Sequence, residues 1–336
     1  MITEQEKLSA HTTLQVGGPA DFFSVFETEA ELESVIAYAI ENDLSVRVLG
    51  GGSNVLIPDE GMSGLIIKNS LLGMVPTVDG DSVRLTASAG ESFDDVVLHC
   101  VTQGWWGLEN LSHIPGSVGA TPIQNVGAYG VEVKDVVESV RVFDIAAKEF
   151  KTLTNEDCKF GYRDSVFKSE AGKSYVVTAV TFRLSTHPKP LLAYKDLVKF
   201  FEENKQPSLS EIREAVIEIR SKKFPDWKQV GTAGSFFKNP IVSADKFKKL
   251  REEYPEMPGY EMPSDTIKIP LGWILDKVLQ VKGVREGNVG TYEGQALVLI
   301  NHGGASSAEI SAFAQNIINE VQERLDIVVE WEVTRW

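Results

Sequence analysis

The stretch that decides the fold is residues 48–57, Val48-Leu49-Gly50-Gly51-Gly52-Ser53-Asn54-Val55-Leu56-Ile57. One apolar run ends at Leu49 and another begins at Val55, so we expect a strand on each side of the glycines. Consecutive glycines let backbone N–H groups turn inward together, which makes a concavity for an anion such as a pyrophosphate. Taken alone, the pattern fits a tight turn equally well. Because no helix follows and neither G-x-G-x-x-G nor G-x-x-x-x-G-K-[ST] occurs, it disfavours a Rossmann site.

The residues around this stretch predict a chain of mixed α and β structure. Residues 20–26 and 44–49 have strand character, and Thr28 with Glu31 fits a capping box that opens a helix over 31–42, which makes a β-α-β unit. Further on, Ser92 and Gly104 are placed to begin and end a helix. The middle third is rich in predicted strands, which cover residues 82–89, 136–144 and 174–184.

A second glycine-rich segment covers residues 107–130. It contains one charged residue, Glu109, so we expect a packed loop and not a flexible linker. Its small residues permit close backbone approach, and four side chains can hydrogen-bond to phosphates or to a heteroaromatic ring: Ser117, Thr121, Gln124 and Asn125. Two such loops in one chain favour a site that holds the two ends of an extended dinucleotide.

The last third is predicted to form a separate domain. A Pro/Ser stretch at 206–208 precedes a helix that a Ser208 and Glu211 capping box opens, and we place a boundary there. Helical patterns follow at 243–254, 271–280 and 306–325, with a strand at 295–301. The chain ends in IVVEWEVTRW, where Val329, Trp331 and Val333 alternate with polar residues, which predicts a half-buried strand.

Composition excludes several classes of protein. The chain has 336 residues, with 33 Lys and Arg against 48 Asp and Glu, so the net charge of −15 argues against a nucleic-acid partner. No apolar run reaches about 18 residues and the first residues lack a signal pattern, so we expect a cytoplasmic protein without membrane insertion. Cys100, Cys158 and the five histidines show no ligand spacing. We therefore expect buried thiols and no metal.

One local region is basic. Five cations lie between Arg220 and Lys238 against the single anion Asp226, which favours an anionic ligand at that place. For Arg220 and Lys222 we expect a solvated helix end instead. Lys223 and Lys238 flank Thr232-Ala-Gly-Ser-Phe-Phe-Lys-Asn-Pro240, where a hydroxyl, an amide and an ammonium group come close together among apolar residues.

Together these segments resemble the UDP-N-acetylenolpyruvoylglucosamine reductase (MurB) family over nearly the whole chain. The resemblance rests on HTTLQVGGPADFF, VLGGGSNVLI, GLENLSHIPGSVGATPIQNVGAYG, FGYRDSVFK, AGSFFKNP, IPLGWILDKV, QALVLIN and EVTRW. It implies an α+β protein: a two-part FAD-binding fold of the vanillyl-alcohol-oxidase/PCMH-like type plus a C-terminal α+β substrate-binding domain. The implied ranges are 1–72 and 73–206 for the two FAD-binding parts, the second joined by strand 326–336, and 207–325 for the UDP-sugar domain.

The resemblance also implies cofactors, partners and cofactor contacts. NADPH would reduce a non-covalent FAD, and the flavin would reduce the enolpyruvyl ether of a small-molecule UDP-sugar, giving UDP-N-acetylmuramate for peptidoglycan synthesis. It implies no obligate protein partner. The cofactor contacts would be Gly50, Gly51, Gly52, Ser53, Asn54, Gly116, Ser117, Gly119, Thr121, Gln124, Asn125, Gly127 and Ala128.

Three residues are implied to be catalytic. Hydride addition to the alkene pushes negative charge onto the substrate carboxylate, so a cation and preorganised donors are needed. By resemblance Arg163 is the cation, Glu332 is a hydrogen-bond donor if an apolar site keeps it protonated, and Ser235 is the proton donor, assisted by Lys223 or Lys238. Implied substrate contacts are Tyr162, Tyr194, Lys223, Asn239 and Gln295.

Alternatives stay open for the catalytic glutamate and for the function. The tail contains Glu-Trp-Glu where the resemblance leads us to expect Glu-Pro-Glu, so Glu330 competes with Glu332 for the glutamate role. The alternative functions are an FAD-dependent oxidase of related fold and a UDP-sugar- or flavin-binding protein without turnover. The Ser235 motif and the cationic stretch disfavour the oxidase, and the presence of Arg163, Ser235 and Glu332 disfavours the protein without turnover.

Overall fold

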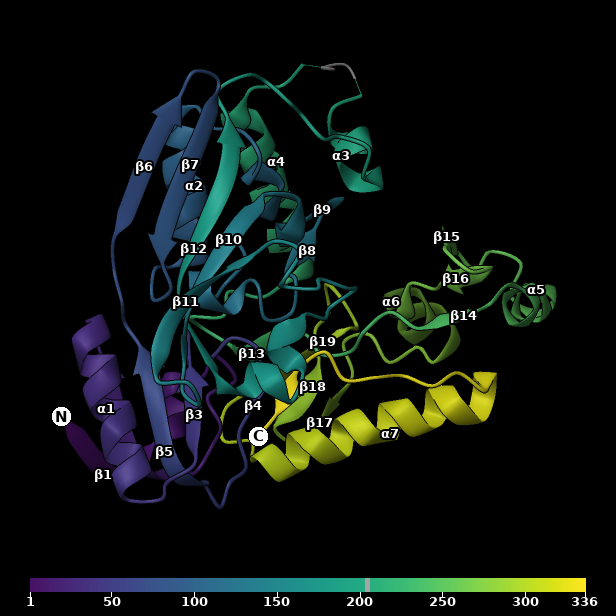
Figure 1. Ribbon diagram of the computed structural model, residues 1–336. Coiled ribbons are helices and arrows are strands. Elements are labelled where there is room, and N and C mark those ends of the chain that lie inside the picture. Colours follow the sequence, from purple (N-terminus) through teal and green to yellow (C-terminus); the bar gives the residue numbers. More distant parts are fainter. Residues whose placement is uncertain (203–205) are drawn as a thin grey trace. The chain divides into compact units, whose positions relative to one another are not determined.

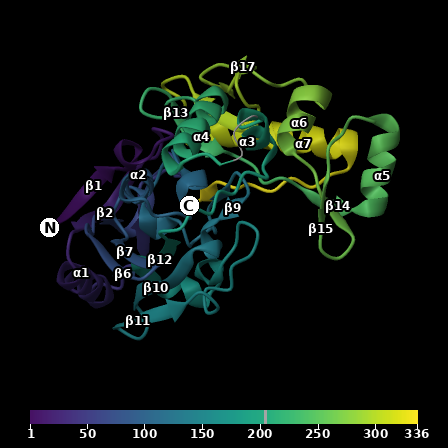
Figure 2. The same cartoon turned by 90° about the horizontal axis from the view of Figure 1, so that it is seen from above.

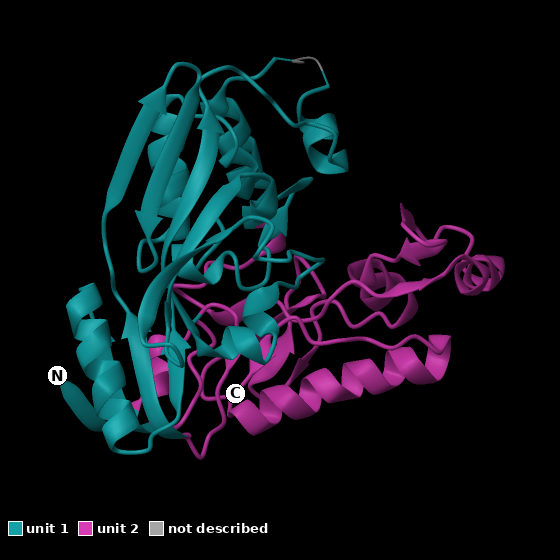
Figure 3. Ribbon diagram, in the orientation of Figure 1, with its two compact units in different colours: residues 1–6, 20–52, 63–221 teal, residues 7–19, 53–62, 222–336 magenta. Residues whose placement is uncertain are grey.

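The computed structural model describes residues 1–202 and 206–336, which form two compact units (Figure 3). Unit 1 comprises Met1–Glu6, Ala20–Gly52 and Ser63–Ser221, and unit 2 comprises Lys7–Pro19, Ser53–Met62 and Lys222–Trp336. This division by compactness differs from the predicted ranges 1–72, 73–206 and 207–325. The functional assignment of those ranges stays a prediction.

The first sheet of unit 1 confirms the predicted β-α-β unit. Its strand order is β1 (Ile2–Lys7), β2 (Pro19–Phe26), β5 (Met62–Asn69) and β3 (Val46–Leu49), and helix α1 (Glu29–Glu41) connects β2 to β3. β3 and β5 run parallel. The apolar face of α1 packs with Phe26 and Leu65. Half of the predicted capping box forms: Thr28 accepts from the Glu31 N–H, whereas the Glu31 carboxylate accepts from the N–H of Glu27.

The second sheet of unit 1 has five antiparallel strands, visible side by side in Figure 1. Its order is β11 (Glu149–Thr154), β10 (Val137–Asp144), β12 (Tyr175–Ser185), β7 (Ser82–Ser88) and β6 (Met74–Asp79). Helix α2 (Phe93–Gln103) packs on it through Phe93 and Val97, with Ser92 and Gly104 as its caps. The strands and helix that the sequence predicts here are confirmed. Cys100 and Cys158 are buried and free, as expected.

The remaining elements of unit 1 are small, except for one long helix. They are the hairpin β8 (Gly127–Ala128) and β9 (Val131–Glu132), and helices α3 (Lys195–Phe200) and α4 (Leu209–Lys223). The predicted Ser208–Glu211 capping box is present in full at the start of α4. α4 buries Ile212 and Val216 in a cluster that also contains Tyr129 and Leu197 of α3.

Unit 2 contains two sheets, a strand pair and three helices. One sheet has the order β13 (Gly231–Ser235), β19 (Val298–Asn301), β18 (Val289–Thr291), β17 (Arg285–Glu286), and the other has β14 (Ile241–Ser243), β16 (Thr266–Lys268), β15 (Tyr260–Met262). β20 (Thr334–Arg335) pairs in parallel with β4 (Val55–Leu56). The helices are α5 (Ala244–Glu253), α6 (Leu271–Trp273), which continues as a π-helical turn, and α7 (Ser307–Leu325), drawn in yellow in Figures 1 and 2.

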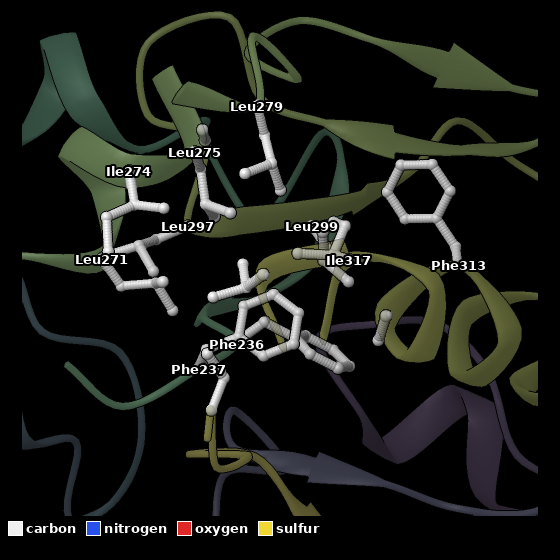
Figure 4. Packing of buried hydrophobic residues seen from close by; sticks show 14 of the residues in the cluster. Phe236, Phe237, Leu271, Ile274, Leu275, Leu279, Leu297, Leu299, Phe313 and Ile317 are labelled. Carbon is white, nitrogen blue, oxygen red and sulfur yellow. The ribbon is translucent and has the colours of Figure 1, made fainter. Parts of the chain in front are cut away.

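The core of unit 2 gathers large apolar side chains from these elements. Figure 4 shows Phe236 and Phe237 near Leu297 and Leu299 of the strand-bearing segment and Ile317 of α7. The Asp59 carboxylate stabilises the start of α7, because it accepts hydrogen bonds from the N–H groups of Ser307 and Ala308. Among the residues that the structure describes, no helix is long and apolar enough to span a membrane.

The C-terminal tail differs from the predicted strand. Only Thr334–Arg335 pairs as a strand, and Trp331 makes an isolated bridge to Phe237. The predicted alternation of burial is nevertheless present: Val329 and Val333 are buried while Glu330 and Thr334 are exposed. The tail is therefore extended, but it pairs first with Phe237 and then with β4. This change of partner prevents one continuous strand.

Candidate active site

The two glycine-rich segments lie directly against each other in unit 1. A β-carbon added at Gly51 would lie 2.8 Å from Gly116 Cα, and one added at Gly50 would lie 2.4 Å from Ser117 Oγ. Backbone cannot move aside as a flexible side chain can, so position 51 requires glycine for this approach. The contact brings the backbones of both segments together, as a shared dinucleotide site needs.

Segment 107–130 is a packed loop, as predicted. It contains two short 3-10 helices, Glu109–Leu111 and Val118–Ala120, and Ser117, Thr121 and Asn125 are buried in it. The Thr121 hydroxyl donates to the Val118 carbonyl at 2.8 Å. Gly119 also lies tight against its surroundings, since an added β-carbon would be 2.7 Å from Ala89 Cβ. The assignment of these residues as cofactor contacts stays a prediction.

Asn125 ties this loop to the turn that carries Arg163. Its side-chain amide donates to the Gly161 carbonyl at 2.9 Å and to Glu132 at 3.0 Å, and its oxygen accepts from the N–H of Lys134 at 3.1 Å. Gly161 and Asp164 form an antiparallel bridge, so residues 161–164 make a tight turn. Within unit 1, the predicted cofactor segment and the predicted catalytic arginine are thus joined by a fully buried amide.

The Arg163 guanidinium reaches the glycine-rich segment itself. Its Nη2 donates to the Gly127 carbonyl at 2.9 Å, and its Cζ lies 5.6 Å from the centre of the Tyr162 ring. Arg163 adopts φ +54°, a left-handed conformation that costs energy for a residue with a side chain. The surrounding hydrogen bonds hold this conformation. Residues in such rarely populated backbone conformations are common at functional sites.

Arg220 corrects one expectation. We expected a solvated helix end, but Arg220 is only 9% exposed and its Nε donates to the His113 carbonyl at 3.0 Å. Burial lowers the pKa of Arg220. The helical period explains the difference: two turns separate Arg213 from Arg220, and both lie beside the buried Ile212, Val216 and Ile219 face of α4.

Arg213 and Asp94 form a second anchor that the sequence did not indicate. Both guanidinium Nη atoms donate to the Asp94 carboxylate, at 2.7 and 3.0 Å, and the same carboxylate accepts from the N–H of His113 at 2.5 Å. Burial raises the pKa of Asp94, but the hydrogen bonds from Arg213 and His113 outweigh it, so the pKa lies below its ordinary value. Through both arginines, α4 fixes the start of the second glycine-rich segment.

Tyr194 stands at the start of α3 in unit 1. It is 41% exposed, and its ring meets the Tyr129 ring edge to face with centroids 5.2 Å apart. Tyr129 is buried at the end of the second glycine-rich segment, and burial raises its pKa to about 12. This contact places a predicted substrate residue beside the predicted cofactor loop.

Ser235 and Glu332 are brought together in unit 2. Ser235 ends β13, just after an irregularity in its pairing with β19. The carbonyl of the next residue, Phe236, accepts from the Glu332 N–H at 2.9 Å. Asn54, a predicted cofactor residue, donates through its side chain to the Glu332 carbonyl at 3.3 Å, and its own carbonyl accepts from Thr334 N–H at 3.1 Å. Three predicted site residues are therefore neighbours.

Glu330 has a different environment. Its carbonyl accepts from the Lys238 N–H at 2.9 Å, and its carboxylate pairs with the Lys238 ammonium at 2.8 Å. The Glu330 side chain is 66% exposed. The choice between Glu330 and Glu332 for the glutamate role, and between Lys223 and Lys238 as the cation that assists Ser235, stays a prediction.

The tryptophan in Glu-Trp-Glu is compatible with the backbone pairing. Both hydrogen bonds of the Phe237–Trp331 bridge use the flanking residues, so the bridge does not need the Trp331 N–H. A proline at this position would keep the same two bonds. The indole adds packing, since its ring lies 5.0 Å from that of Phe236 and the Arg335 guanidinium lies 4.7 Å from its centre.

The predicted substrate residues of unit 2 gather at the start of α6. Asn239 Oδ1 accepts from the Leu271 N–H at 2.9 Å. Gln295 lies beside the next residue, since a β-carbon added at Gly272 would be 2.6 Å from Gln295 Oε1. The carbonyl before Lys223 lies against Gly294, 2.3 Å from where a β-carbon would stand. Asn239 and Gln295 thus both lie beside the first turn of α6, and the backbone just before Lys223 passes next to Gly294, the neighbour of Gln295 in the sequence.

Comparisons with known proteins show the family of the chain. Residues 20–152 match a family described as FAD binding domain, and residues 226–336 match the C-terminal domain of UDP-N-acetylenolpyruvoylglucosamine reductase. UDP-N-acetylenolpyruvoylglucosamine reductase of Porphyromonas gingivalis (strain ATCC BAA-308 / W83) is 38% identical over 99% of this chain and 98% of its own. That of Cupriavidus pinatubonensis is 41% identical over 97% of this chain and 96% of its own.

Solved structures give the same result. The crystal structure of UDP-N-acetylenolpyruvylglucosamine reductase (MurB) from Thermus caldophilus covers 100% of both chains with a TM-score of 0.70 at 26% identity. A solvent-stable cholesterol oxidase covers 100% of this chain and 87% of its own, with a TM-score of 0.52 at 11% identity, which concerns the fold alone. The predicted fold class, an FAD-binding fold plus a C-terminal α+β domain, is confirmed. The chain belongs to the UDP-N-acetylenolpyruvoylglucosamine reductase family.

Proposed function

We propose that this protein is an FAD-dependent oxidoreductase that reduces the enolpyruvyl group of UDP-N-acetylenolpyruvoylglucosamine, with NADPH as the electron donor. The product is UDP-N-acetylmuramate, a precursor of peptidoglycan. The observation that carries the proposal is the backbone pairing that sets Ser235 beside Glu332, because an enolpyruvyl acceptor needs a proton donor and an electrophilic group that act together.

The residues of unit 1 fit an FAD site. The meeting of Gly51 with Gly116 gathers two backbone segments that a side chain would drive apart. We assign Gly50, Gly51, Gly52, Gly116 and Ser117 to the pyrophosphate, because N–H groups in such loops bind anions. FAD, when bound, supplies the reversible two-electron chemistry that links NADPH to the substrate.

The catalytic residues manage charge and one proton. When hydride adds to the terminal alkene carbon, electrons move onto the neighbouring carbon and its carboxylate. The guanidinium of Arg163 stabilises that charge, and so does the carboxyl group of Glu332, which acts in its protonated form as a hydrogen-bond donor. Ser235 Oγ–H then protonates the neighbouring carbon, and its proton is replaced from solvent. Because a hydroxyl is a weak acid, we assign the supporting positive charge to Lys223.

The substrate's uridine diphosphate portion has its own residues in this proposal. Asn239 and Gln295 lie beside the first turn of α6, and we assign them, with Lys223, to the diphosphate and the nucleoside because amide groups and an ammonium suit these groups. Tyr194 and Tyr162 offer aromatic faces. Binding energy from this remote portion orients the enolpyruvyl group for reaction.

The test uses the purified protein under anaerobic conditions. We expect a yellow FAD spectrum that NADPH bleaches and that UDP-N-acetylenolpyruvoylglucosamine restores in stoichiometric amount. Reoxidation by oxygen, with no response to the UDP-sugar, would instead support an oxidase. A colourless protein that binds no added FAD would reject the proposal.

A further inference from the structure

We infer that Asn110 is a positioning residue for the substrate: its side-chain amide holds the segment that carries Tyr194 against the second glycine-rich segment. The inference rests on the proposed function, because it concerns the UDP-sugar that Tyr194 is proposed to bind.

The hydrogen bonds of Asn110 define its role. One amide nitrogen donates to the Tyr129 carbonyl at 2.9 Å and to the Leu191 carbonyl at 2.8 Å. These acceptors lie 19 and 81 residues away along the chain, so a single NH₂ group joins two distant segments. Both of its N–H bonds are used, and the side chain is only 1% exposed. The joint is therefore shielded from water, which strengthens it.

The other half of the same amide has an energetic cost. Within residues 1–202 and 206–336, Asn110 Oδ1 is the one buried side-chain nitrogen or oxygen that has no hydrogen-bond partner. Buried polar atoms in native proteins are nearly always paired, so each exception needs an explanation. The amide identity is fixed, because two carbonyls face the nitrogen. We attribute the unpaired oxygen to the need for two donors at this position, which no apolar side chain supplies.

The joint acts on Tyr194 through its neighbours. Leu191 lies three residues before Tyr194, and Tyr129 provides the ring against which Tyr194 packs. The Tyr194 Cβ also lies 4.0 Å from the place where a β-carbon on Gly130 would stand. Tyr129 in turn is hydrogen-bonded to the buried Arg220. Asn110 thus fixes both sides of the Tyr129–Tyr194 ring contact at the level of the backbone.

The test compares Asn110→Leu, Tyr194→Ala and the double variant in steady-state reduction of UDP-N-acetylenolpyruvoylglucosamine. We expect Asn110→Leu to raise KM for the UDP-sugar about tenfold with little change in kcat, since uniform substrate binding is lost. If Asn110 acts through Tyr194, the double variant will have the KM of Tyr194→Ala alone. Independent, multiplicative effects on KM would overturn the inference.

Asn155→Leu is the matched control. Its amide nitrogen also donates to two backbone carbonyls, those of Lys134 and Val137, at 2.8 and 2.7 Å. A merely structural loss would therefore appear in both variants, whereas we expect the rise in KM in Asn110→Leu alone. An equal rise in both would overturn the inference.

A second variant and a second measurement keep the inference testable if Asn110→Leu does not fold. Asn110→Ser retains one donor and should raise KM by less. Hydrogen exchange of residues 186–202 should accelerate in Asn110→Ser and not in Asn155→Leu, and unchanged exchange would count against the joint. Exchange needs no substrate, so it separates failure of this inference from failure of the proposed function.

Discussion

The glycine-rich region of unit 1 and the Ser235–Glu332 region of unit 2 hold their site residues in different ways. In unit 1, backbone meets backbone at Gly51 and Gly116, and buried side chains such as Asn125 and Asp94 fasten the loops from behind. In unit 2, Ser235 ends a strand of the four-stranded sheet, and Glu332 lies on the extended tail, where its N–H donates to the Phe236 carbonyl. By the proposed roles, unit 1 contributes the close-packed glycine segments and Arg163, whereas unit 2 contributes Ser235 and Glu332.

The largest effect should come from a reactive side chain of unit 2. Ser235→Ala removes the proposed proton donor, and we expect the oxidative half-reaction to slow by about 10² to 10⁴ while NADPH still bleaches the flavin, because general acids contribute on that scale. Stopped-flow absorbance of the flavin measures both halves. Ser243→Ala, which removes only the N-cap of α5, is the control. Normal reoxidation in Ser235→Ala would exclude the serine.

For a substitution among the close-packed glycines of unit 1, we expect weaker FAD binding and unchanged reaction steps in the protein that retains FAD. Gly51→Ala places a methyl group against Gly116, and overpacking of about 1–3 kcal/mol should weaken FAD binding by about 10- to 100-fold. Flavin content after dialysis measures this. Gly104→Ala is the control, since it strains a φ of +76° but meets no atom within 4 Å. It should lose stability and keep its flavin, and flavin loss in both variants would contradict this expectation.

The two tail glutamates sharpen the contrast within unit 2. Glu332→Ala should lower kcat/KM by about 10², as loss of one preorganised donor does. Glu330→Ala should lower it by less than about fivefold, because its exposed pair with Lys238 is worth at most about 1 kcal/mol. The reverse ranking would assign the role to Glu330.

The smallest effect concerns the supports of unit 1. The folded-state pKa of Asp94 is below its ordinary value, so its carboxylate stabilises the fold above the unfolded pKa and this contribution is lost as pH falls through the folded value. Asp94→Asn should therefore cost about 1–3 kcal/mol at pH 7, and the difference should shrink below about pH 4.

Urea unfolding at both pH values measures this effect of Asp94→Asn. Glu170→Gln removes an exposed ion pair with Lys173 and should change stability by less than about 0.5 kcal/mol. A pH-independent difference between wild type and Asp94→Asn would show that the Asp94 charge is not the cause.

The sequence predicted those parts of the molecule that local patterns determine. The caps Ser92 and Gly104, the strands of the second sheet and the packed glycine loop are confirmed, because each depends on neighbours within a few residues. Arg220 was assigned wrongly because its charge outweighed its helical position in our reasoning. Asn110 and Asp94 gave no signal, because their partners lie 19 to 119 residues away and no local pattern records such contacts.

The site itself was predictable in part. The resemblance supplied Arg163, Ser235 and Glu332, and the catalytic roles of these residues remain proposals. The contact of Asn54 with Glu332 spans 278 residues and depends on the parallel pairing of β4 with β20. Such pairing is set by tertiary packing, so it lies beyond what alternation of polar and apolar residues can indicate.

The bridge between Phe237 and Trp331 determines which residues position 331 of the tail can accept. Its two hydrogen bonds are made by the residues on either side of Trp331. The residue at position 331 is therefore constrained by side-chain packing and makes neither backbone hydrogen bond of the bridge. Proline and tryptophan can therefore replace each other at position 331 while Glu332 keeps its backbone position. A change at position 331 should therefore alter the packing around Phe236 and Arg335 while the backbone hydrogen bonds of Glu332 stay in place.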